Sequence, residues 1–383
     1  MRPPLIRAFG LIASAVAVPL LSELRVARPS RPLTSNWEQL SVAPRGAMRL
    51  GLSFRPPQVD ALGLDPREAL SRLLNYPFHI LRLGAYWRRM EPGPGTFATD
   101  ELERQLDAAE HAGKQVLLCV GAVKTFGYPE FFVPPHLLPR PIREGIRVRP
   151  HDHPWLLGPA SEFITRVVDR FKGRPCIVAW QVEHESVDPL GLEHSWRLDA
   201  AFVEAEIAAV RQADPQGRPI VLNGFWPMSY LVALQQWWRT RDQGDSVSFA
   251  LHHADIVGLD VYPRHGLVSL GPLTAYLTGG RGPWHACARA RLFADARAGG
   301  RQVMISEGQA EPWETTVRPP SPRRAAAYSC PPERLILNYN DCLSWSNDLY
   351  AYLFWGAEYW LMRANQGDPS YLQAFARVLE RSG

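Results

Sequence analysis

The sequence predicts a protein of the α/β class that folds as a (β/α)8, or TIM, barrel. Eight short apolar runs recur along the chain, helix-like amphipathic stretches lie between most of them, and no glycine-rich phosphate-binding turn follows a run. Apolar strands that alternate with amphipathic helices indicate a parallel sheet covered on both faces, and this number of repeats indicates closure into a barrel. An open doubly wound sheet, the main alternative, usually carries a GxGxxG or GxxxxGK[ST] turn, and neither motif occurs.

The eight predicted strands are rich in aliphatic and aromatic residues. They span residues 48–54, 79–87, 115–122, 176–185, 219–226, 254–262, 302–307 and 350–355. The clearest helices between them, at 100–112, 160–171 and 198–213, place apolar residues at helical spacing. Long segments at 126–153, 264–284 and 313–338 follow strands, and we expect them to be loops on the active-site face of the barrel.

The N-terminus has the layout of a secretory signal. Arg2 and Arg7 precede an apolar run at residues 8–21, which is short for a membrane span of ~20 residues. We expect residues 1–24 to be a signal peptide or membrane anchor, 25–46 a linker and 47–383 the catalytic barrel. The protein would then be secreted or membrane-anchored outside the cytoplasm; an ordinary N-terminal helix stays open, as does the oligomeric state.

Composition excludes several classes of function. The formal net charge is +4, and no basic cluster of the kind that binds nucleic acid occurs. Histidines and cysteines lack the spacing of a metal site, so we expect no metal and no cofactor. Of the five cysteines, Cys330 and Cys342 are left as a candidate disulfide in an exported protein.

Active sites of such barrels lie where the strands end, so the polar residues there are the candidates for catalysis. Glu185 ends the fourth predicted strand and Glu307 the seventh. Cleavage of a sugar acetal needs one protonated carboxyl group and one ionised carboxylate, and aromatic faces stack on sugar rings. The carboxylates at or near strand ends are Glu183, Glu185, Asp260, Glu307 and Glu358, and the candidate substrate-binding residues there are Arg82, Trp87, His184, Asn223, Tyr262 and Trp355.

Two short motifs resemble those of glycoside hydrolase clan A, the retaining β-glycosidases that include cellulase-like and β-galactosidase-like members. The segment WQVEHE at 180–185 is similar to the clan's fourth-strand motif, and ISEG at 305–308 to its seventh-strand nucleophile motif. The resemblance covers roughly residues 50–363. It implies that Glu185 is the acid/base and Glu307 the nucleophile of a double displacement on β-linked oligosaccharides or polysaccharides. It also implies that Arg82 and Tyr262 flank the nucleophile and that Trp355 forms the floor under the sugar.

Position 184 departs from the clan pattern. The clan places Asn directly before the acid/base, and this chain has His184. A neutral histidine can make one hydrogen bond to the same sugar hydroxyl, so the role can survive, or the substrate can be altered or the enzyme weakened. Strand alternation places Glu183 on the same face as Glu185, and the motif match favours Glu185.

Two other functions remain as alternatives. One is a catalytically impaired carbohydrate-binding or cell-surface protein on the same barrel, which His184 and the N-terminal segment favour. The other is a Schiff-base lyase, which needs a lysine at a strand end. Of the three lysines only Lys124 lies near such a position, so this alternative ranks last.

Overall fold

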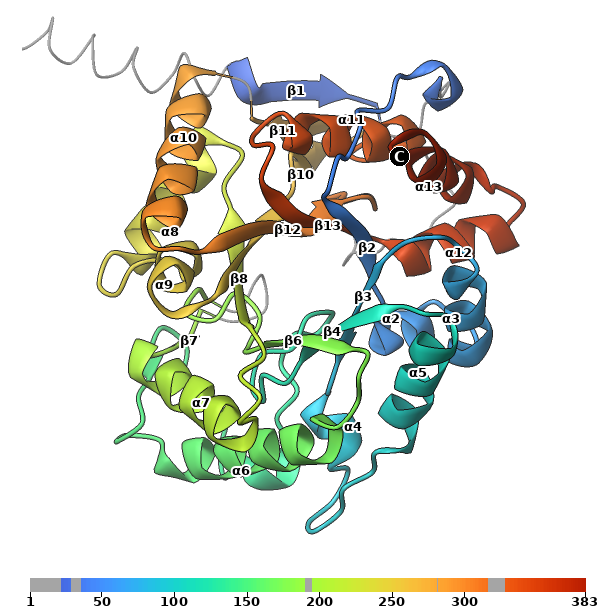
Figure 1. Ribbon diagram of the computed structural model, residues 1–383. Helices are drawn as coiled ribbons and strands as arrows, with labels where there is room; N and C mark the ends of the chain where they lie inside the picture. Colours follow the sequence, from blue (N-terminus) through green and yellow to red (C-terminus); the bar gives the residue numbers. More distant parts are fainter. Residues whose placement is uncertain (1–21, 29–35, 190–194, 281, 316–327) are drawn as a thin grey trace, which may run out of the picture.

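Eight parallel strands close into a barrel in the computed structural model, which describes residues 22–28, 36–189, 195–280, 282–315 and 328–383 (Figure 1). Around the ring the order is β12-β13-β2-β3-β4-β6-β8-β9, and β12 pairs with β9 to close it. The predicted α/β class and TIM-barrel fold are confirmed. The barrel strands are β2 (Arg49–Ser53), β3 (Ile80–Gly84), β4 (Gln115–Cys119), β6 (Ile177–Gln181), β8 (Ile220–Trp226), β9 (Ile256–Val261), β12 (Gln302–Gln309) and β13 (Leu349–Trp355).

Helices form the outer layer around this ring (Figure 1). Several begin at an aspartate whose side chain accepts a backbone N–H of the first turn, as Asp65 does from Glu68 at 2.8 Å. Their bounds are α2 (Pro56–Ala61), α3 (Pro66–Leu74), α4 (Trp87–Met90), α5 (Asp100–His111), α6 (Pro154–Phe171), α7 (Ala200–Ala213), α8 (Tyr230–Thr240), α9 (Ser246–His253), α10 (Pro283–Ala298), α11 (Pro332–Leu343), α12 (Ala357–Asn365) and α13 (Ser370–Arg381).

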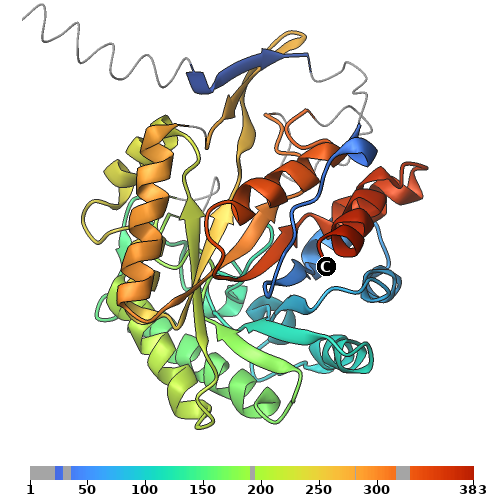
Figure 2. The same ribbon diagram turned by 45° about the horizontal axis from the view of Figure 1, so that its top comes forward.

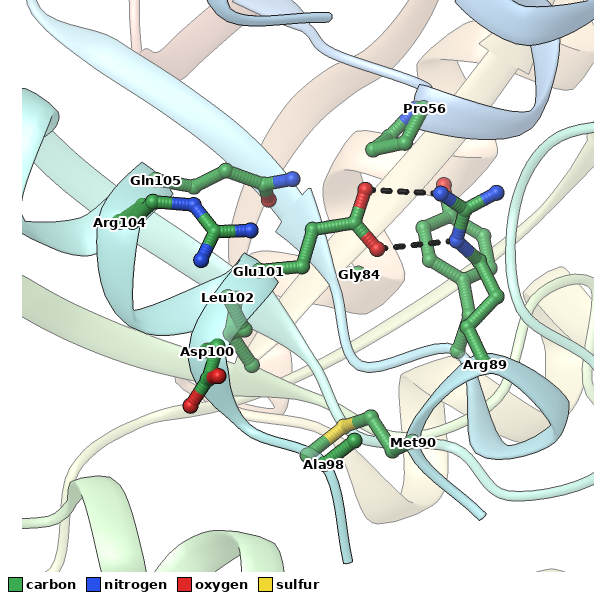
Figure 3. Close-up of a pocket in the computed structure, with 11 residues that line it drawn as sticks. Pro56, Gly84, Arg89, Met90, Ala98, Asp100, Glu101, Leu102, Arg104 and Gln105 are labelled. Carbon is green, nitrogen blue, oxygen red and sulfur yellow. Dashed lines mark hydrogen bonds and ion pairs between the residues drawn. The ribbon is translucent and has the colours of Figure 1, made fainter. Parts of the chain in front are cut away.

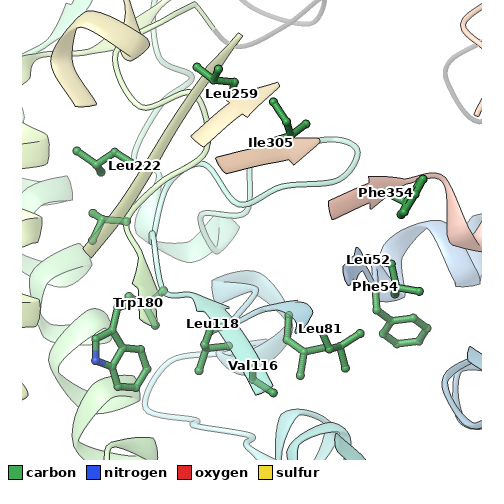
Figure 4. Packing of buried hydrophobic residues seen from close by; sticks show 14 of the residues in the cluster. Leu52, Phe54, Leu81, Val116, Leu118, Trp180, Leu222, Leu259, Ile305 and Phe354 are labelled. Carbon is green, nitrogen blue, oxygen red and sulfur yellow. The ribbon is translucent and has the colours of Figure 1, made fainter. Parts of the chain in front are cut away.

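Alternation along each strand builds two apolar layers. One set of side chains fills the inside of the barrel: Ile80, Leu117, Ala179, Val221, Ile256, Met304, Ala351 and Leu353. Neighbouring residues in the sequence point outward and pack under the helices. Figure 4 shows this outer set, which includes Leu81, Leu118, Trp180, Leu222 and Ile305. Because both faces are buried, the strands are mostly apolar, which is why the sequence pattern revealed them.

The segment after β9 differs from the predicted loop at 264–284. It forms a hairpin of β10 (Arg264–Leu270) and β11 (Leu273–Thr278), and β1 (Leu24–Ala27) joins it to give an antiparallel sheet in the order β1-β11-β10. Figure 2 shows this sheet standing above the barrel rim. Part of the predicted linker is therefore a strand, because backbone pairing with β11 stabilises it.

Smaller elements complete the described chain. They are the 3-10 helices η1 (Trp37–Gln39) and η2 (Pro135–Leu137) and a two-stranded sheet of β5 (Arg147–Val148) and β7 (Arg197–Leu198). The predicted helix at 160–171 begins earlier, at Pro154, because a proline fits the first turn of a helix. All five cysteines are free, so the candidate pairing of Cys330 with Cys342 is wrong for this structure. Within the described residues, no helix combines the length and the apolar character needed to span a membrane.

Candidate active site

Glu307 lies near the end of β12, buried, and three side chains from other strands or their ends bind its carboxylate. Arg82 donates from Nη1 to Oε1 at 2.6 Å, and the Tyr262 hydroxyl donates to Oε2 at 2.5 Å. His184 Nε2 lies 2.9 Å from Oε1. The structure thus brings together Arg82, His184, Tyr262 and Glu307, which lie far apart in the sequence.

These contacts decide the charge on Glu307. Burial by itself would raise the pKa of its carboxyl group, but the positive charges of His184 and Arg82 and the hydrogen bonds from His184 and Tyr262 lower it to about 2. Glu307 is therefore ionised at neutral pH, which is the state that a nucleophile requires.

Glu185 has the opposite tendency. It follows β6 and is partly exposed at the surface of the site. Burial raises the pKa of its carboxyl group well above the ordinary value; the charge of His184 lowers it, and the negative charges of Asp260 and Glu130 add to the rise. Glu185 and Glu307 both raise the pKa of His184, and a carboxyl group with a raised pKa in the same site as one with a lowered pKa is expected of a general acid and its partner.

The backbone after β6 separates Glu183 from Glu185. Both residues have positive φ, 57° for Glu183 and 45° for Glu185, so the strand alternation that placed them on one face does not extend to them. The Glu183 carboxylate is fully buried and accepts the backbone N–H groups of Val123, at 2.9 Å, and Lys124. These bonds fix the Glu183 side chain in a structural role and leave Glu185 as the carboxyl group open to solvent.

Lys124 is also held in place. Its ammonium group donates to the backbone carbonyl oxygens of Glu185 and Asp188, the latter at 3.0 Å, and the side chain is buried. A lysine nitrogen that is buried and bonded to two backbone carbonyl oxygens is not free to attack a carbonyl carbon, which counts against the Schiff-base alternative.

His184 differs from the neutral form considered from the sequence. Burial lowers the pKa of its imidazole, but the attraction of Glu307 and a hydrogen bond to it outweigh burial and raise the pKa to about 9. At neutral pH His184 is a cation that donates to the candidate nucleophile. Its ring lies parallel to Trp355, with an interplanar angle of 1° and 6.4 Å between ring centroids.

A second polar layer supports these residues. The Asn223 amide donates to Asp260 at 2.6 Å, and Asn223 Oδ1 accepts the Gln181 amide at 2.9 Å and the Glu185 N–H at 3.3 Å. The Ser306 hydroxyl donates to Asp260 at 2.6 Å. Asn223 is fully buried beneath Glu185, so its candidate role becomes that of positioning the strand ends.

Trp355, at the end of β13, is buried in the site between aromatic and cationic side chains. The Arg55 guanidinium lies 4.1 Å from its ring centroid, and its indole Nε1 has no hydrogen-bond partner among the described residues. Arg55 is itself fully buried and pairs with Glu311 at 2.8 Å and Glu358 at 2.6 Å. This ion-pair cluster supports the indole from below.

Trp87 does not belong to the site. It begins α4, is fully buried, stacks on Phe163 of α6 at 5.3 Å between ring centroids and donates from its indole to Glu91 at 2.9 Å. The prediction that it binds substrate is wrong, because the strand ends at Gly84 and the following turn carries residue 87 into the layer between helices.

Two aromatic residues near the site, Tyr128 and Trp313, were not predicted from the sequence. Tyr128 is partly exposed, and burial together with the charges of Glu130, Glu311, Glu185 and Glu307 raises the pKa of its hydroxyl. Trp313 lies 4.7 Å from Tyr262 between ring centroids. Both stand in long loops without periodic pattern, so only their aromatic character could have indicated a role.

A cavity of about 230 Å³ lies away from these residues, between α4 and α5 (Figure 3). Glu101 and Arg89 form an ion pair across it at 2.8 Å, and Arg89 also contacts Asp60. Neither candidate catalytic glutamate lines this cavity. The ion pair is partly exposed and has no group arranged for proton transfer beside it, so we assign the cavity no role.

One cluster has the spacing of metal ligands. His184, Asp260 and Glu307 offer ligand atoms that lie within 4.8 Å of one another, and all three are buried. Arg82 already donates to Glu307, and His184 is protonated at neutral pH. Two cations in contact with the same carboxylate oppose a third, and a protonated imidazole nitrogen cannot coordinate a metal.

Solved structures with the same fold include two xylanases and a GH5_18 enzyme. Xylanase 10B from Thermotoga maritima matches with a TM-score of 0.50 and 16% identity, over 89% of this chain and 98% of that one. Xylanase 10B from Thermotoga petrophila in complex with xylobiose matches with 0.50 and 15%, over 91% and 99%. A GH5_18 variant from Streptomyces cattleya in complex with Manb1-4GlcNAc matches with 0.52 and 14%, over 80% and 70%.

Comparison at the level of sequence finds no relative: no family model matches, and no curated protein does. At these identities the similarity to solved structures establishes the fold. The chain therefore has the (β/α)8 barrel fold of clan A glycoside hydrolases.

Proposed function

We propose that this protein is a retaining glycoside hydrolase that cleaves β-linked glycosidic bonds, with Glu307 as nucleophile and Glu185 as acid/base. The observation that carries the proposal is the opposite shift of two carboxyl groups in one site. The pKa of Glu307 is lowered to about 2, and the pKa of Glu185 is raised. The lowered pKa favours the ionised form of Glu307 and the raised pKa favours the protonated form of Glu185, as double displacement requires.

The chemistry follows from this difference. Glu307 attacks the anomeric carbon while Glu185 transfers its proton to the departing oxygen, which gives a glycosyl ester on Glu307 and a free alcohol. Glu185, now ionised, takes a proton from water, and the resulting hydroxide equivalent displaces the sugar from Glu307. Two inversions at one carbon retain its configuration.

Unpartnered polar atoms beside the carboxylates support a sugar ligand. Trp355 Nε1, His184 Nδ1 and Arg82 Nη2 are buried and have no hydrogen-bond partner among the described residues. Buried donors without partners are costly unless a ligand or water satisfies them. Sugar hydroxyls accept such bonds, and the Trp355 face offers an apolar platform for a ring. The complexes of similar structures with xylobiose and Manb1-4GlcNAc agree with an oligosaccharide or polysaccharide substrate.

Covalent trapping tests the proposal. Incubation with 2-fluoro β-glycosides of several sugars, followed by digestion and mass spectrometry, is expected to place the label on Glu307. Glu307→Gln is expected to abolish labelling and turnover. Glu185→Ala should lose turnover and recover part of it with azide, whereas the matched variant Glu183→Ala should gain nothing from azide. Turnover by Glu307→Gln at the wild-type rate would reject the assignment.

A catalytically impaired glycan-binding protein is the second candidate. The ion pair between His184 and Glu307 favours it, because a cation on the nucleophile opposes transfer of its electrons to carbon. Glycan binding by the wild-type chain without any fluoroglycoside labelling would support this candidate over the enzyme.

The N-terminal segment supports a location outside the cytoplasm. The charged start and the apolar run at 8–21 are the features of an export signal or an anchor. Cell fractionation with N-terminal sequencing of the mature protein distinguishes secretion from anchoring, and a cytoplasmic protein with an intact start would overturn both.

A further inference from the structure

The sheet formed by β1, β11 and β10 has one face that is exposed near the hairpin turn, although Leu277, on the same face farther from the turn, is buried. Val26 and Val268 both lie opposite Ala275, and Leu270 lies opposite Leu273 at the hairpin end. Opposed residues, and residues two apart in one strand, share a face of a sheet. These five residues, which we name the outer sheet face, are therefore neighbours, and four of them are strongly exposed: Val26 by 62%, Val268 by 51%, Leu270 by 75% and Leu273 by 41%.

The opposite face holds the sheet on the barrel. Thr274 and Tyr276 alternate with the outer residues and are buried. The Tyr276 hydroxyl donates to Glu314 at 2.5 Å, and its ring packs on Tyr328 with centroids 4.6 Å apart. The contacts of Tyr276 therefore hold the sheet in place by one face, and the residues on the opposite face stay exposed in this position.

The chemistry of the hairpin is unusual for a surface turn. No charged residue occurs from Gly266 to Gly280, and the turn Gly271-Pro272 has a leucine on each side. Surface hairpins normally carry polar or charged residues, which prevent association. Arg28, two residues after Val26, is exposed and positive, whereas Arg25 lies opposite Tyr276 and so belongs to the other face.

The first described residues of the chain lie beside this sheet. Glu23, two residues after residue 21, is buried and accepts hydrogen bonds from the Ser229 hydroxyl at 2.7 Å and the Tyr230 N–H at 3.0 Å. It also contacts His285 at 3.2 Å. These bonds fix Glu23 in place, one residue before β1 begins.

We propose that the outer sheet face lies on a lipid bilayer with an anionic surface. The run at 8–21 has 14 residues, and an α-helix of that length measures ~21 Å, less than the ~30 Å of a hydrocarbon core. A second apolar contact beside it would add to a weak attachment. Exposed valines and leucines enter the acyl region, and Arg28, which is exposed two residues after Val26, faces anionic headgroups.

Two other occupants fit less well. The run at 8–21 is apolar on all sides, so covering the sheet with it would leave its own far side exposed to water. A second copy of the chain that covers the outer sheet face would leave the apolar run at 8–21 without a partner. A bilayer covers both the run and the outer sheet face and complements Arg28.

Bilayer contact would also place the candidate active site near the membrane. The hairpin follows β9, at the end of the barrel that carries Tyr262, and the Gly266 N–H donates to the Trp313 carbonyl at 2.8 Å. The membrane contact is independent of the proposed catalysis, since none of the five residues of the outer sheet face contacts Glu185 or Glu307.

A fluorescent probe on the hairpin tests the proposal. In the full chain with the exposed Cys287 changed to Ser, Leu270→Cys is labelled with bimane, and Arg104→Cys on α5 provides the control. With vesicles of phosphatidylcholine and phosphatidylglycerol we expect a blue shift and quenching by brominated acyl chains at position 270 and neither at 104. Adding Leu273→Asp is expected to reduce the quenching about tenfold, because a carboxylate is excluded from acyl chains; Arg104→Asp should not change it.

Three results would overturn the proposal. Equal signals at positions 270 and 104 with vesicles would show that the face stays in water. A probe at 270 that is shielded from iodide before vesicles are added, with twice the monomer mass by light scattering, would identify a second copy. Shielding of the probe from iodide at the monomer mass would show that another segment of the same chain covers the outer sheet face.

Discussion

Replacement of His184 by Asn tests the electrostatics of the site without an activity assay. The imidazole has an ordinary pKa of 6.5, and the site raises it to about 9. A folded pKa above the unfolded value means that the group stabilises the fold below pH 6.5 and that this stabilisation is lost as the pH rises through 9. At 1.36 kcal/mol for each pH unit, the stabilisation is about 3 kcal/mol.

His184→Asn should therefore lower the free energy of unfolding most at acidic and neutral pH. Urea denaturation is expected to show a deficit relative to the wild type that shrinks by about 3 kcal/mol between about pH 6 and pH 10. Asp260, whose pKa is raised to about 7 by burial and by Glu307, loses a positive neighbour in the variant and titrates at higher pH. Because the titration of Asp260 also changes the pH dependence of stability, the pKa of the His184 imidazole should be measured directly.

Proton NMR supplies that measurement. The histidine resonance that is missing from the variant spectrum should titrate in the wild type near pH 9. His252→Asn, at an exposed position on α9, serves as the matched control. Its free energy of unfolding should follow that of the wild type over the same pH range. If the missing resonance titrates near 6.5, or if the deficit of His184→Asn is the same at all pH values, the ion pair with Glu307 is not formed in solution.

Three further substitutions separate structural from catalytic roles. Arg55→Met leaves two carboxylates buried without their cation and should lower the free energy of unfolding by about 3–5 kcal/mol. The control Arg89→Met breaks a partly exposed pair and should cost less than about 1 kcal/mol. Equal losses for the two variants in denaturant titrations would contradict this reasoning. Trp87→Ala should cost about 3–5 kcal/mol and leave kcat/KM of the folded fraction unchanged, so a selective loss of kcat/KM would return Trp87 to the site. Gly121→Ala brings a Cβ to 2.1 Å from the Glu183 backbone nitrogen. It should abolish glycosidase activity, because it displaces the segment that carries Glu185. In the control Gly93→Ala the new Cβ meets nothing within 4 Å, so activity and melting temperature should equal those of the wild type.

The barrel could be predicted because its signal is local. Each parallel strand is buried on both faces, so its apolar run is visible within a few residues, as in the strands that became β4 and β9. The strand ends then restrict the chemistry to a few residues, and the short motifs around Glu185 and Glu307 select two of them. No similar pattern marks β10 and β11, whose stability comes from pairing with each other and with β1.

The sequence by itself determined the barrel and the polar residues at its strand ends, because strand order brings those ends to one rim, and the resemblance to clan A selected Glu185, Glu307, Arg82 and Tyr262 among them. Only the tertiary structure decided that Trp87 lies in the core, that Glu183 binds backbone N–H groups, and that His184 is a cation. The physical reason is that each of these outcomes depends on a contact between distant segments. His184 and Glu307 are 123 residues apart, and no local pattern reports the charge that one places on the other.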